Sequence, residues 1–181
     1  FLVVSDHAEL MGGIRSIHRN GVDTSDLGLI DTIKAQGAAW ILKRAIDSGD
    51  GRKLFVSILP DPALTPKEDA EGSMLASSNV SLLPVPAQIE IDTWKTITDI
   101  ADTHNQPGEF TALIGWEWSA IPAGANLHRV VVTDANAATA QQFVPFGLDD
   151  SPFPEDLWTW LEKTSASTGA QFTAIPHNSN I

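Results

Sequence analysis

The chain has 181 residues, of which 43% are hydrophobic, and it contains no cysteine. This composition predicts a globular chain that buries a core, and it excludes disulfides and thiolate metal sites. The net charge of −12, without any cluster of Lys or Arg, argues against nucleic acid and anionic membrane surfaces as partners. No apolar run approaches the length of a transmembrane helix. The compartment stays unknown, since cytoplasm and periplasm both fit.

The hydrophobic pattern predicts strands that alternate with helices along the chain. Residues 1–5 are apolar and β-branched, which predicts a short buried strand. Further strands are expected over residues 110–116, 128–133 and 171–175. Helices are expected over residues 30–47, 86–104 and 154–166. A helical or irregular insertion is expected around residues 20–85, which are rich in proline from residue 60 onward. The alternation predicts an α/β fold with a mostly parallel sheet.

Three of the predicted strands end in polar residues. The first runs into Asp6-His7-Ala8-Glu9, the second into Gly115-Trp116-Glu117-Trp118, and the last into Pro176-His177-Asn178-Ser179-Asn180. In parallel α/β sheets and barrels the chemistry gathers beyond the carboxyl ends of the strands, where the loops converge. Three strand ends that each supply a histidine or a carboxylate therefore predict a metal site.

The first two strand ends supply His7 and Glu117 as candidate metal ligands. An imidazole binds metal through one nitrogen, and its other nitrogen needs an acceptor, for which Asp6 is a candidate unless it binds metal itself. Glu9 fits a first-turn helix acid as well as a site role. Glu117 is a carboxylate in an apolar strand, and leaving it unpaired there costs several kcal/mol. A bridging position between two metal ions would satisfy both of its oxygens.

The remaining candidates are His128, which precedes its strand, and His177, which follows one. Their alternative interpretations are a histidine at a sheet edge and a turn histidine. Arg129 either pairs with an acid or receives a substrate phosphate, and Asn178 either supports the site or forms a turn. There is no glycine-rich phosphate loop and no serine in a nucleophile elbow, so a serine hydrolase is not expected.

Taken together, SDHAE, GWEWS, NLHR, PHNSN and FPEDLW resemble motifs of the PHP (polymerase and histidinol phosphatase) superfamily, in particular those of bacterial PHP-like proteins of unknown function. The resemblance covers residues 1–181 and is loose over residues 20–85. It implies a distorted seven-stranded (β/α)7 barrel with two or three divalent metal ions (Zn, Mn or Fe). Glu117 would bridge two ions, His128 and His177 would complete one site, and His7 would bind a third ion. The implied activity is hydrolysis of phosphoesters by metal-activated water.

The superfamily's opening H-x-H motif and its closing motif lie outside these residues. The resemblance therefore implies one partial domain over residues 1–181, truncated at both ends, with partial or absent metal and little activity by itself. An incomplete barrel exposes sheet edges, which favours self-association. The expected substrate is a small phosphorylated molecule. The alternatives are an amidohydrolase-like, metal-dependent hydrolase acting on a carbon centre, and a non-catalytic barrel that binds a ligand or partner.

Overall fold

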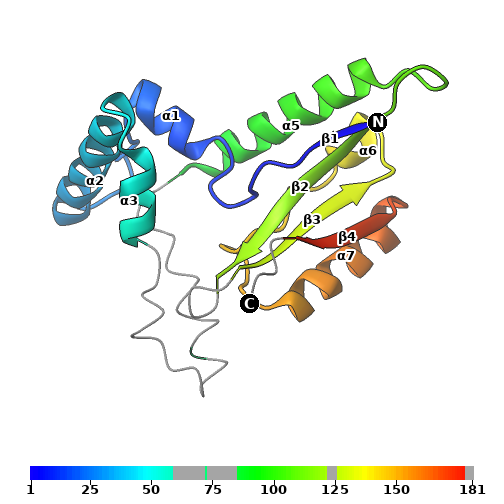
Figure 1. Cartoon of the computed structure of the whole chain (residues 1–181). Helices are drawn as coiled ribbons and strands as arrows, with labels where there is room; N and C mark the ends of the chain where they lie inside the picture. Colours follow the sequence, from blue (N-terminus) through cyan, green and yellow to red (C-terminus); the bar gives the residue numbers. More distant parts are fainter. Residues whose placement is uncertain (59–71, 73–84, 122–125, 178–181) are drawn as a thin grey trace.

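The computed structural model describes residues 1–58, 72, 85–121 and 126–177. These residues form a small α/β domain on a four-stranded sheet with the strand order β1-β2-β3-β4 (Figure 1). The strands are β1 (Leu2–Val4), β2 (Ala112–Ala120), β3 (Leu127–Thr133) and β4 (Phe172–His177). The helices are α1 (Gly13–Asn20), α2 (Leu29–Asp47), α3 (Gly51–Ile58), α5 (Ala87–His104), α6 (Ala137–Ala140) and α7 (Pro154–Thr168).

The sheet is open and mixed, so the expected (β/α)7 barrel with a mostly parallel sheet is wrong. Strand β1 pairs with β2 in parallel, whereas β2–β3 and β3–β4 are antiparallel pairs. The connection between β2 and β3 comprises only residues 121–126. A parallel pair needs a crossover of a dozen or more residues, so a connection this short joins antiparallel neighbours. No helix had been expected between these two strands, and the inferred alternation fails at that point.

Most of the expected elements are present, with shifted ends. The helices expected over 30–47, 86–104 and 154–166 are α2, α5 and α7, and α7 opens with Pro154 and two acids as its sequence indicates. The expected burial of the first strand is wrong, because Leu2 and Val4 are each 53% exposed. The cause is that β1 is an edge strand, which has β2 as its single neighbour in the sheet.

Helices α1, α2 and α3 form a group beside the N-terminal end of α5 (Figure 1). This group includes two helices of the segment expected as an insertion around residues 20–85. The proline-rich part of that segment falls almost entirely outside the described residues. No helix in the described part of the chain is both long enough and apolar enough to cross a membrane.

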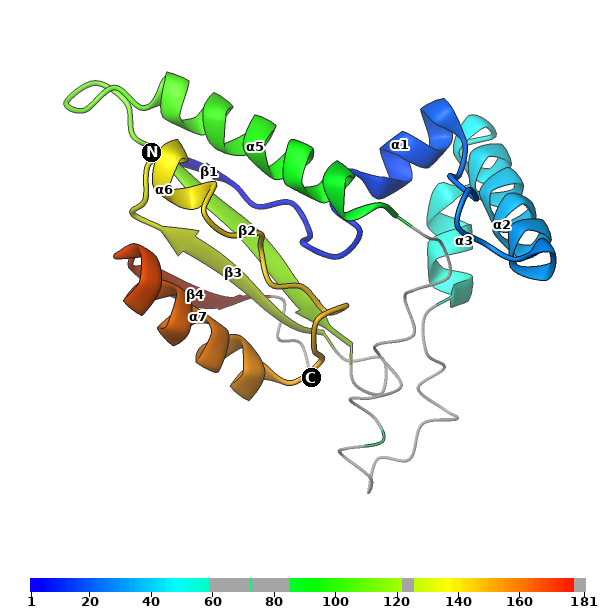
Figure 2. The same ribbon diagram turned by 180° about the vertical axis from the view of Figure 1, so that it is seen from behind.

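The two faces of the sheet differ in what covers them. On one face, Trp116 and Trp118 are fully buried against the helices, and Figure 2 shows α6 and α7 lying in front of the sheet. The ring of Trp116 has its centroid within 6.1 Å of four aromatic rings, those of Trp94, Phe143, Trp160 and Phe172. Because successive strand residues point to opposite faces, Glu117 and Ser119 lie on the other face of β2.

Candidate metal centre

The strand register brings three candidate ligands together at one end of the sheet, where β2 and β4 finish and β3 begins. His128 is the register partner of both Ser119 on β2 and His177 on β4, and Glu117 lies two residues before Ser119. Because β3 runs antiparallel to both neighbours, its first residues lie beside the last residues of β2 and β4. His128, the second residue of β3, therefore lies at the same end of the sheet as the last residues of β2 and β4.

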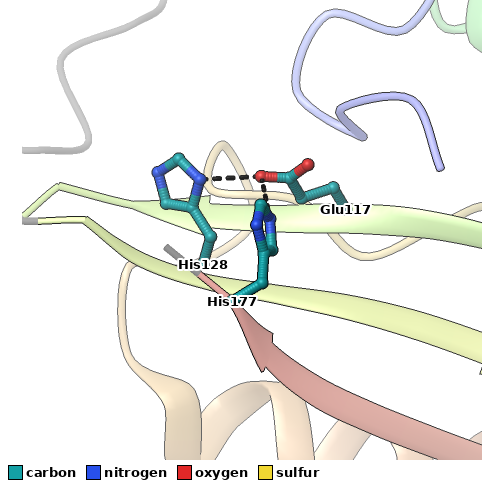
Figure 3. Close-up of side chains that lie close together, drawn as sticks. All are labelled: Glu117, His128 and His177. Atoms are coloured by element: carbon teal, nitrogen blue, oxygen red, sulfur yellow. Dashed lines mark ion pairs between the residues drawn. The ribbon is translucent and has the colours of Figure 1, made fainter. Parts of the chain in front are cut away.

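Glu117, His128 and His177 form a compact cluster on the face opposite the tryptophans (Figure 3). His128 Nδ1 lies 2.7 Å from Glu117 Oε1, and His177 Nε2 lies 3.0 Å from the same oxygen. One potential ligand atom from each of the three residues lies within 4.8 Å of the others. Bonds of about 2 Å to a tetrahedral ion put ligand atoms about 3.5 Å apart, so the cluster has the dimensions of a metal site.

The hydrogen bonding of the two histidines supports the same interpretation. The Nε2 atom of His128 is buried and has no hydrogen-bond partner in the described part of the chain, whereas the buried Nε2 of His177 contacts Glu117 Oε1. Buried polar groups are nearly always hydrogen-bonded, so the unpaired Nε2 of His128 beside a buried carboxylate needs an explanation. Imidazole and carboxylate together suit Zn, Mn or Fe. The group can therefore hold a metal ion.

The pKa values at the cluster reflect burial and mutual contact. Burial works to raise the pKa of Glu117, but the contact with His177 and the charges of the surrounding imidazoles outweigh it, so the pKa is lowered. Burial lowers the pKa of His128 and outweighs the opposing effect of Glu117. These directions favour an ionised carboxylate beside a neutral imidazole at His128, which are the protonation states that bind metal.

His7 lies at the side of this cluster. The pairing of β1 with β2 resumes beyond Val4, with a bridge between His7 and Glu117. The ring of His7 packs edge-on against that of His128 with centroids 5.8 Å apart, and His7 Nε2 lies 3.9 Å from Glu117 Oε1. A hydrogen bond to Glu9 raises the pKa of His7; burial opposes this, and the nearby carboxylates add to it.

A family model described as "protein of unknown function (DUF3604)" matches residues 1–181. The chain belongs to the DUF3604 family. No PHP family model matches, and the sheet is not a barrel, so the inferred membership of the PHP superfamily is wrong. No curated protein and no solved structure matches this DUF3604 chain. The family description names no activity, so the site itself must carry the functional argument.

The four residues expected to support the metal ligands in this DUF3604 chain differ in their position relative to the cluster. Asp6 contributes its backbone oxygen, which accepts from Glu117 N at 2.8 Å, while His7 Nδ1 contacts Glu9 and Ser119. Arg129 pairs in register with Trp118, which assigns it to the opposite face from the cluster, and its guanidinium donates to the carbonyl of His128. Asn178 lies outside the described residues.

Glu9 and Ser119 take part in the site more directly than the sequence indicated. The Ser119 hydroxyl donates to Glu117 Oε1 at 3.1 Å and lies 2.9 Å from His7 Nδ1. Ser119 had been considered only as a nucleophile. The alternation within GWEWS was the signal that could have found it, because Ser119 must share a face with Glu117. Nothing in the local sequence indicated that Glu9 would contact β2.

The cluster lies on the sheet face and not in the deep cavity of the domain. A cavity of about 490 Å³ lies on the helix-covered side, between α5, α7 and the loop of residues 142–150. Its lining includes the acids Glu90, Asp149 and Asp150, and none of the three clustered ligands. The cluster is instead accessible from the other face, where the side chain of His177 is 37% exposed.

Proposed function

We propose that this DUF3604 chain is a metal-dependent hydrolase with Glu117, His128 and His177 as its metal ligands. The observation that carries the proposal is the convergence of His128 and His177 on the buried carboxylate of Glu117, with ligand atoms of all three residues within 4.8 Å of one another and His128 Nε2 buried without a partner in the described residues. An ion at such a site lowers the pKa of a water molecule and neutralises charge that develops on the substrate. Phosphoesters are the first substrate class that we propose.

The chain's own residues hold and orient the ligands. Glu117 supplies the negative charge, and its Oε1 is held by the hydroxyl of Ser119. His128 and His177 project from neighbouring antiparallel strands in direct register, so the ladder between β3 and β4 fixes their separation. The aromatic core behind β2 holds the strand that carries Glu117. A site on a rigid sheet keeps its geometry better than one on loops.

The choice between phosphoesters and uncharged substrates depends on positive charge at the site. A chain with a net charge of −12 repels an anionic substrate unless a local cation attracts it, and a bound metal ion can be that cation. Arg129, which the sequence offered either as the partner of an acid or as a phosphate ligand, belongs to the opposite face by register. This observation favours a second candidate, hydrolysis of an uncharged ester or amide at a carbon centre.

A comparison of model substrates on the zinc- or manganese-loaded chain tests the proposal. We expect release of p-nitrophenol from p-nitrophenyl phosphate or its diester to require metal and to be lost in Glu117→Gln. His104→Asn, which changes an exposed histidine at the end of α5, is the matched control and should retain activity. Hydrolysis of p-nitrophenyl acetate without phosphoester hydrolysis would support the second candidate. Metal binding without hydrolysis of any of these substrates would contradict both, and absence of metal binding would overturn the metal centre itself.

A further inference from the structure

Glu9 is a buried carboxylate that connects three segments distant in the sequence. Its side chain is 8% exposed. Oε1 accepts hydrogen bonds from the backbone N–H of Ser119 on β2 and of Leu148 in the loop between α6 and α7, both at 2.9 Å. Oε2 lies 3.3 Å from His7 Nδ1. Two backbone donors thus hold one carboxylate oxygen in place, and this leaves the second oxygen directed at His7.

These contacts determine which nitrogen of His7 carries the proton. A carboxylate only accepts hydrogen bonds, so Glu9 requires a donor at Nδ1. The Ser119 hydroxyl donates to Glu117 and therefore accepts from the same Nδ1, 2.9 Å away. A neutral imidazole has a single N–H, so its proton lies on Nδ1 and Nε2 keeps a lone pair. That Nε2 is the atom that lies 3.9 Å from Glu117 Oε1.

Packing against His128 constrains only one side of the His7 ring, because the side chain is 55% exposed. Metal-binding histidines commonly donate their second ring N–H to a carboxylate, which sets tautomer and orientation. We propose that Glu9 is a positioning residue that holds His7 in the Nδ1–H tautomer and presents Nε2 as a metal ligand beside Glu117. This inference deepens the proposed function and rests on it.

The substitution Glu9→Gln tests the proposal with almost no change in shape. The N–H groups of Ser119 and Leu148 still require an oxygen at the position of Oε1, so the amide NH2 must take the position of Oε2. An NH2 group opposite Nδ1 repels an N–H there and favours the tautomer with the proton on Nε2. That tautomer has no lone pair to offer at Nε2, and His7 would no longer bind metal.

Two measurements on the 181-residue chain decide the question. Two-bond ¹H–¹⁵N correlation spectra of the metal-free chain at alkaline pH, where imidazole is neutral, should show the Nδ1–H tautomer for His7 and a shift toward Nε2–H in Glu9→Gln. Calorimetric titration with zinc should show about 10- to 100-fold weaker binding in Glu9→Gln. In a His7→Asn background the same substitution should add no further loss, because Glu9 acts through His7.

The inference and the proposed function can fail separately. An Nε2–H tautomer in the wild-type chain, unchanged zinc affinity in Glu9→Gln, or an equal further loss in the His7→Asn background would overturn the role of Glu9. A merely structural role would lower the thermal midpoint of the metal-free Glu9→Gln chain and leave the tautomer unchanged, which also overturns it. If the wild-type chain binds no zinc, manganese or iron, the proposed function fails, whatever the tautomer.

Discussion

Strand β2 contributes residues of different kinds to the two faces of the sheet. On the helix-covered face, Trp116 and Trp118 of β2 are fully buried in an aromatic core. On the other face, Glu117 and Ser119 of the same strand meet histidines from β3 and β4. Because side chains alternate along a strand, one run of five residues supplies both core and site. The candidate ligand Glu117 thus projects from a strand whose opposite face is packed into the aromatic core.

The faces also differ in how well their polar groups are satisfied. Each core indole finds an acceptor: Trp94 Nε1 donates to the carbonyl of Ala140, Trp116 Nε1 to Phe146, and Trp118 Nε1 to Ser151. The opposite face instead holds a buried carboxylate that two imidazoles contact, and the buried Nε2 of His128 has no partner in the described residues. Departures from polar satisfaction concentrate at functional sites, where binding compensates for them. The face with the unpaired nitrogen is thus the face that carries the candidate metal ligands.

The largest effect on stability is expected from Trp116→Ala. This substitution removes the ring at the centre of the aromatic core and leaves a cavity that its four neighbouring rings cannot fill. We expect a loss of about 3–5 kcal/mol in the free energy of unfolding, measured by urea denaturation of the metal-free chain. A loss below about 1 kcal/mol would show that the aromatic face does not hold the fold together.

For Glu117→Gln, on the other face, we expect a large loss of zinc affinity and a small change in stability. The amide keeps the shape of the side chain but removes the negative charge that binds the ion, so zinc affinity should fall at least about 100-fold. The free energy of unfolding of the metal-free chain should change far less than in Trp116→Ala. Isothermal titration with zinc and urea denaturation give the two values. Wild-type affinity in this variant would remove Glu117 from the ligand set.

A pair of neighbouring valines on β3 compares the two faces with identical chemistry. Val131 is fully buried and pairs in register with Trp116, whereas Val130 pairs with Glu117 on the other face and is only partly buried. Val131→Ala should cost about 2 kcal/mol, and Val130→Ala less than about 1 kcal/mol. Denaturation midpoints measure both. Equal losses would contradict the assignment of one face as the packed core.

The smallest effect is a pH dependence of the metal-free chain. The pKa of His128 is lowered from 6.5 by burial. Below pH 6.5 the unfolded chain therefore binds more protons than the folded chain, and the free energy of unfolding decreases as the pH is lowered. The lowered pKa of Glu117 acts in the same direction below its ordinary value of 4.5. The raised pKa of His7 acts oppositely, because it contributes stability below 6.5 that is lost as pH rises through the folded value.

Replacing His128 therefore measures how much its protonation contributes to the pH dependence of stability. The chain with His128→Asn should lose less stability than the wild type on acidification from neutral pH toward the lowered pKa of His128. Thermal midpoints with a chelator present, at two pH values in this window, provide the comparison. A steeper loss in the variant would show that protonation of His128 does not oppose folding.

Sequence reasoning predicted the elements better than their arrangement. Helical periodicity and the proline at position 154 sufficed for α5 and α7, because these signals are local. The direction of β3 depends on the length of its connection to β2, and the barrel expectation disregarded that length. Once β3 is antiparallel, His128 belongs at the same edge as His177. The face of the sheet on which Arg129 lies could also have been predicted, since a strand residue next to His128 must point to the opposite face.

The contacts of Glu9 could not be predicted in the same way. Its partners are backbone N–H groups on β2 and in the loop of residues 147–150, and their approach depends on tertiary packing. For Glu9 the local sequence offered an acid in the first turn of a helix and a site residue as equal alternatives. No periodicity distinguishes an acid that contacts a neighbouring strand from one that faces solvent.

Metal content after purification without chelator tests the central claim most directly. Elemental analysis would compare the wild-type chain with His128→Asn and with the control His104→Asn. The account predicts near-stoichiometric zinc, manganese or iron in the wild type and the control, and a clear loss in His128→Asn. Equal metal in all three chains, or none in the wild type, would contradict a metal centre at Glu117, His128 and His177.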